Sequence, residues 1–143
     1  MKLLETIYCS QYYELKKMGK DPMKARLNGT LLSAVVILLL LMPFILIVNH
    51  YFPHNFIYRF LSYINNGMGG GKFAGKVLGL ACLAIIAGLL YLTIGSKKNY
   101  ESKMVEWSML PETVLQKSLK TSLVIFFCSF AFFVLVIVGT NFV

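Results

Sequence analysis

The sequence has 143 residues, of which 57% are hydrophobic, with a mean hydropathy of +0.69 and a formal net charge of +8. It is too apolar for a soluble domain and too short for two membrane domains, so we expect one membrane domain over residues 1–143. Because the basic residues flank apolar stretches, they predict binding to anionic lipid head groups on the cytoplasmic side, and nucleic acid is excluded as the partner.

The first segment, residues 1–21, is predicted to form an amphipathic cytoplasmic helix. Apolar residues recur at helical spacing over residues 3–18, with charged residues among them. Such a helix lies on the inner leaflet or packs on a partner subunit, and the leaflet is the expected position. Gly19, Asp21 and Pro22 then predict the end of this helix and the start of the next one.

Three stretches without a charged residue predict transmembrane helices: Leu31–Val48, Val77–Ile94 and Ser122–Val138. At about 1.5 Å per residue, each stretch covers most of a hydrocarbon core roughly 30 Å thick. With their flanking residues, the predicted spans cover residues 22–50, 74–95 and 111–143. The expected fold class is therefore an all-α membrane protein with three transmembrane helices.

The connection between the first two spans, residues 51–73, is predicted to carry a short helix that lies flat at the outer membrane interface. Its apolar stripe is about 11 residues long, which is too short to cross a bilayer. Aromatic rings and a long basic side chain are typical of this depth. The residues expected to contact the lipid interface here are Phe56, Arg59, Phe60 and Tyr63.

The second span carries small residues along one side, which is typical of a helix that packs closely against another helix. The residues of this predicted packing interface are Ala74, Ala81, Ala84, Gly88 and Gly95. The pattern fits contact within the chain, with a second copy or with another membrane subunit. The oligomeric state stays open at this point.

The second connection, residues 96–110, is predicted to be cytoplasmic, with Trp107 at the inner lipid interface. Outside the three uncharged stretches, the residues before Leu31 and those between Ile94 and Ser122 together hold eleven lysine and arginine residues, whereas those between Val48 and Val77 hold three. This difference predicts a multi-pass protein of the inner or plasma membrane with a cytoplasmic N-terminus and an external C-terminus.

No enzymatic activity, catalytic residue, cofactor or metal is expected from the sequence. The three uncharged stretches contain no acidic or basic side chain, and no nucleophile lies near a base in the sequence. Pro53 interrupts the spacing between His50 and His54, which would otherwise place both rings on one helix face.

The expected function is therefore that of an accessory or assembly subunit, which binds other membrane subunits or itself through the second span. Two alternatives stay open. One is a homo-oligomeric channel or holin-like pore, and the other is a membrane-embedded protein that acts on lipid.

Overall fold

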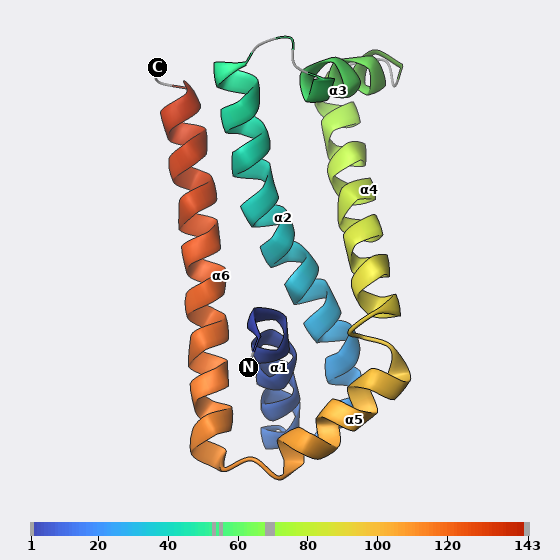
Figure 1. Cartoon of the computed structure of the whole chain (residues 1–143), viewed down its shortest axis with the longest axis vertical. Coiled ribbons are helices and arrows are strands. Elements are labelled where there is room, and N and C mark those ends of the chain that lie inside the picture. Colours follow the sequence, from blue (N-terminus) through green and yellow to red (C-terminus); the bar gives the residue numbers. More distant parts are fainter. Residues whose placement is uncertain (1, 53, 55, 68–70, 142–143) are drawn as a thin grey trace.

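A computed structural model describes residues 2–52, 54, 56–67 and 71–141, with side chains for all of these except residues 65, 71–75 and 141. All the regular elements in this part of the chain are helices (Figure 1): α1 (Leu3–Lys17), the 3₁₀ turn η1 (Pro22–Lys24), α2 (Ala25–Tyr51), α3 (Phe56–Gly67), α4 (Gly71–Leu92), α5 (Lys97–Ser108) and α6 (Glu112–Asn141). The predicted all-helical membrane fold, with an N-terminal amphipathic helix and a short helix after the first span, is confirmed. The helix α5 was not predicted.

Two helical segments are long and apolar enough to cross a membrane. One is Pro22–Tyr51, which consists of η1 and α2 together, and the other is Glu112–Thr140 in α6. The α4 residues from Lys76 to Leu92 pass the same test only together with α5, and the two helices meet at a bend of 68°. Within the described residues, the protein thus has two to three candidate spans. It is a small multi-span helical membrane protein.

The helix α2 is central in the bundle, because it packs against α1, α4 and α6. Figure 1 shows α3 lying crosswise at one end of the bundle and α5 connecting α4 to α6 at the other end. We call these the α3 end and the α5 end. Toward the α3 end, α2 and α6 lie against each other, with the rings of Phe44 and Phe132 6.4 Å apart.

The helix α1 fills the space at the α5 end, where α2 and α6 diverge (Figure 1). Its residues Thr6–Ser10, Tyr12, Tyr13 and Leu15 are buried against the rest of the chain. The expected position of this helix on a leaflet surface is therefore wrong. Its apolar side is covered by its own bundle, because α1 packs against both α2 and α6.

A compact turn connects α1 to α2. Gly19 has a φ of +66°, which favours glycine, and its amide donates to the carbonyl of Lys16 at 3.1 Å. Two residues on, the carboxylate of Asp21 accepts a hydrogen bond from the amide of Met23 at 2.9 Å. The chain thus reverses between α1 and α2 within a few residues.

Candidate functional site

Four aromatic side chains join α1 to α5 at the α5 end of the bundle. Tyr8 and Tyr12 of α1 and Tyr100 and Trp107 of α5 are all buried, and we call them the aromatic cluster. The ring centroids are 6.3 Å apart for Tyr8 and Tyr100, 5.9 Å for Tyr12 and Trp107, and 5.7 Å for Tyr100 and Trp107. Tilted and edge-on contacts at these distances favour a fixed arrangement of the rings.

The sequence analysis placed Trp107 at the inner lipid interface, and this prediction is wrong. Its side chain is 3% exposed and packs inside the chain, because α5 folds back over α1. An aromatic ring with one polar atom fits a lipid interface and a partly polar protein core equally well.

Two tyrosine hydroxyl groups of the aromatic cluster fix it to α2 and η1. The hydroxyl of Tyr8 lies 2.7 Å from that of Thr30, and the hydroxyl of Tyr100 donates to the carbonyl of Pro22 at 3.0 Å. Burial raises the pKa of both tyrosines. A tyrosine hydroxyl of ordinary pKa is already neutral at physiological pH, so both groups carry the proton that these hydrogen bonds need.

Tyr8 occupies a socket formed by two glycines. A Cβ atom at Gly29 would lie 2.6 Å from Cδ1 of the Tyr8 ring, and one at Gly95 would lie 2.8 Å from Oγ1 of Thr30. The helices α1 and α2 and the turn after α4 therefore approach one another closely around one ring. Gly95 was predicted to pack against a helix, whereas the sequence analysis did not single out Tyr8 and Gly29.

The end of α4 is also held to α2 by Arg26. Its guanidinium donates a hydrogen bond to the hydroxyl of Tyr91 and lies 4.6 Å from the centroid of that ring. A cation over an aromatic face is attracted by the electrons of the ring. This contact and the close approach at Gly95 attach α4 to α2 near the α5 end.

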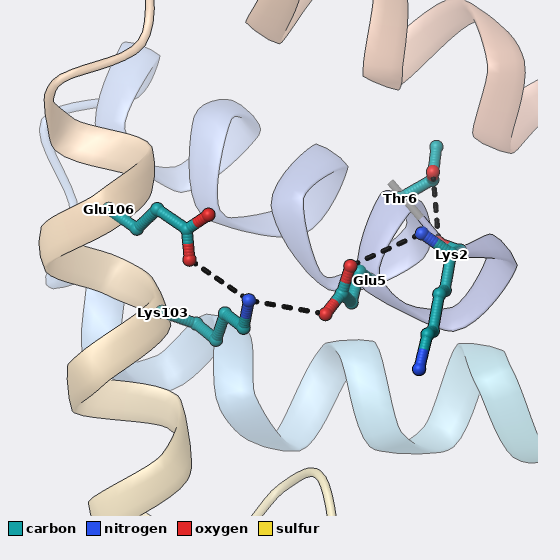
Figure 2. Close-up of polar contacts among 5 residues, drawn as sticks. All are labelled: Lys2, Glu5, Thr6, Lys103 and Glu106. Carbon is teal, nitrogen blue, oxygen red and sulfur yellow. Dashed lines mark hydrogen bonds and ion pairs between the residues drawn. The ribbon is translucent and has the colours of Figure 1, made fainter.

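A polar bridge links α1 to α5 beside the aromatic cluster, as Figure 2 shows. The ammonium of Lys103 lies 3.2 Å from a carboxylate oxygen of Glu5 and 2.9 Å from one of Glu106. The other oxygen of Glu5 accepts a hydrogen bond from the backbone amide of Lys2 at 3.2 Å. The hydroxyl of Thr6 donates to the carbonyl of Lys2 at 3.2 Å.

The bridge makes the stability of the fold depend on pH. The hydrogen bond from the Lys2 amide is the main reason that the pKa of Glu5 lies below its ordinary value of 4.5; burial opposes this effect and Lys103 adds to it. The stabilisation by Glu5 is therefore present above pH 4.5 and is lost as the pH falls through the lowered pKa of the folded chain.

We expect Glu5→Gln to destabilise the protein slightly at neutral pH, because partly exposed ion pairs contribute little. The difference in stability between the variant and the wild type should disappear in acid. There the Glu5 carboxyl group of the wild type is protonated in both the folded and the unfolded chain. Thermal unfolding in detergent over a pH series measures this difference. A difference that persisted unchanged in acid would contradict a role for the Glu5 carboxylate.

The predicted packing interface of the second span is divided in the structure. Gly95 contacts α2 and α1, whereas Ala81, Ala84 and Gly88 are exposed. No atom lies within 4 Å of the position that a Cβ of Gly88 would take. The side chain of Ala74 lies outside the described residues. We call Ala81, Ala84 and Gly88 the small-residue face of α4.

The residues predicted for the outer lipid interface all lie on α3. Phe56, Arg59, Phe60 and Tyr63 are exposed, and the rings of Phe56 and Phe60 stack with their centroids 6.2 Å apart. Their exposure leaves them free to contact lipid, but they do not contact the aromatic cluster. They lie at the opposite end of the bundle from the aromatic cluster (Figure 1).

In the described part of the chain, no three His, Cys, Asp or Glu side chains gather so that they could hold a metal ion. Comparison of the chain with protein-family models, with curated proteins and with solved structures finds no match.

Proposed function

We propose that this small multi-span membrane protein is a non-enzymatic accessory or assembly subunit of a larger membrane complex. Its partner would bind along the small-residue face of α4. The observation that carries the proposal is that Ala81, Ala84 and Gly88 are exposed along α4, although Gly95, in the turn just after this helix, is packed. Small residues allow the backbone of another helix to approach closely, and lipid tails cannot replace the dispersion attraction between two such backbones.

The arrangement of the acidic side chains supports a non-enzymatic role. Five carboxylates take part in contacts that join two helices, cap a helix or form an ion pair along one helix. Glu5 and Glu106 contact Lys103, Glu101 lies 3.9 Å from Lys97, Glu112 accepts a hydrogen bond from Tyr13, and Asp21 caps η1. These contacts give the acids structural roles.

The partner can be tested with Gly88→Leu, matched by Gly139→Leu on α6, where a Cβ would also meet open space. On native gels of gently solubilised membranes, we expect the wild type and Gly139→Leu to migrate within a complex. Gly88→Leu should migrate as a smaller species, because a bulky side chain separates backbones that need to touch.

Equal migration of the two variants would contradict the proposed docking face. The composition of the complex separates the alternatives. A complex with other subunits supports an assembly role, whereas a complex of this chain alone favours a homo-oligomeric channel or holin-like pore.

We also propose that the α5 end of the bundle is cytoplasmic and that the protein lies in the inner or plasma membrane. The excess of basic residues near α1, α5 and the start of α6 supports this orientation. A phosphatase that requires export should be active when fused after Val143 and inactive when fused after Tyr100. The opposite pattern would reverse the orientation.

A further inference from the structure

A groove of about 400 Å³ lies between α1, α2 and α6, on a part of the surface that does not include α4. Its lining combines polar and apolar side chains: Ser10, Gln11, Glu14, Leu32, Leu119, Ser122, Leu123, Phe126 and Phe127. Leu123 is 51% exposed and Phe127 is 64% exposed, and both belong to a candidate span. The groove therefore opens on a surface that faces lipid.

The polar and apolar parts of the groove come from different helices. The α1 wall contributes only polar groups, whereas the α6 wall is mainly apolar and extends about 12 Å from Leu119 to Phe127 at 1.5 Å per residue. The hydroxyl of Tyr13 donates to the carboxylate of Glu112 at 3.0 Å, which holds α1 against the start of α6. The two walls are thus fixed relative to each other.

Glu14 is the one charged residue in the lining. One oxygen of its carboxylate accepts a hydrogen bond from the side-chain amide Nε2 of Gln11 at 3.2 Å, and no cationic side chain of the described residues lies within ion-pair distance. A carboxylate beside apolar surface favours a cation that can donate hydrogen bonds to it. An anionic group without such a cation would be repelled.

We propose that this groove binds one membrane glycerophospholipid whose head group carries a primary ammonium. The ammonium would contact Glu14, and one acyl chain would lie along Leu123 and Phe127. The volume falls within the range of about 300–1,000 Å³ that is common for ligand sites, and the groove holds the head group and the first part of the chain. The proposal does not rest on a partner at α4.

The test uses the full chain in nanodiscs that contain equal amounts of phosphatidylethanolamine and phosphatidylglycerol, followed by native mass spectrometry of the released protein. We expect the wild type to retain one phosphatidylethanolamine in preference to phosphatidylglycerol by about tenfold, as a charge-assisted hydrogen bond predicts. Glu14→Gln should abolish this preference. Glu101→Gln, which removes an exposed carboxylate of α5 outside the groove, should keep it.

A second variant tests the acyl part of the groove. Phe127→Ala should reduce the retention of lipid and leave the head-group preference unchanged. The proposal would be overturned if the wild type retained both lipids equally or retained none, or if Glu14→Gln kept the preference for phosphatidylethanolamine. An unchanged melting temperature of Glu14→Gln shows that the variant is folded.

Discussion

Replacing Trp107 by alanine is expected to lower the free energy of unfolding by about 3–5 kcal/mol, the range for truncating a buried aromatic side chain. The ring is 3% exposed and contacts Tyr12 of α1 and Tyr100 of its own helix. Its removal would leave a cavity between α1 and α5 that the two helices can fill only by moving. Unfolding of the purified protein in detergent, followed by circular dichroism, measures the loss.

Met109→Ala is the matched control, because Met109 follows α5 two residues after Trp107 and is 78% exposed. A surface truncation of this kind changes stability by about 0.5 kcal/mol or less. If the two variants unfolded alike, the aromatic cluster would not hold α5 against α1.

Gly29→Ala is expected to destabilise the protein by about 1–3 kcal/mol, although it adds only one methyl group. The new Cβ would lie 2.6 Å from the ring of Tyr8, which is buried and hydrogen-bonded to Thr30 and so has no space to retreat. The strain should loosen α1 first. The rate of tryptic cleavage after Lys16 and Lys17 is therefore expected to rise together with the fall in melting temperature.

The control for this substitution is Gly139→Ala in α6, where a Cβ would meet no atom within 4 Å. Because alanine favours a helix over glycine by about 1 kcal/mol, this control should be neutral or slightly more stable. Equal stability of the two alanine variants would show that α1 does not pack tightly on α2.

The helical class of the fold could be predicted because length and hydropathy are local properties of the sequence. An uncharged stretch such as Leu31–Val48 has to satisfy its backbone hydrogen bonds within itself if it is surrounded by lipid. The helix α5 was not predicted, because its sequence has charged residues on several sides and lacks an apolar stripe at helical spacing. Its position depends on the bend after α4.

The position of α1 could not be predicted, because its pattern is compatible with two environments. Tyr8 and Tyr12 have apolar rings and polar hydroxyls, which fit a lipid interface as well as a protein core. The protein core is the environment of α1 because α2 and α6 diverge at the α5 end and α1 packs between them. The residues of α2 and α6 that contact Tyr8 and Tyr13, such as Thr30 and Glu112, lie more than twenty positions further along the sequence. For the same reason, periodicity marked Gly88 and Gly95 alike, although one is exposed and the other is packed.

The position of α1 also determines when its contacts can form during synthesis of the chain. Its partners at Tyr100 and Glu112 lie about ninety or more positions further along the chain, and Tyr13 is separated from Glu112 by 99 positions. Because α1 is synthesised before α5 and α6, the side of α1 that packs on them stays uncovered until α5 and the start of α6 have been made. A chain whose synthesis ends before α5 and the start of α6 leaves the aromatic side of α1 exposed. Chaperones and proteases can therefore recognise incomplete chains by this exposed surface, which is buried in finished molecules.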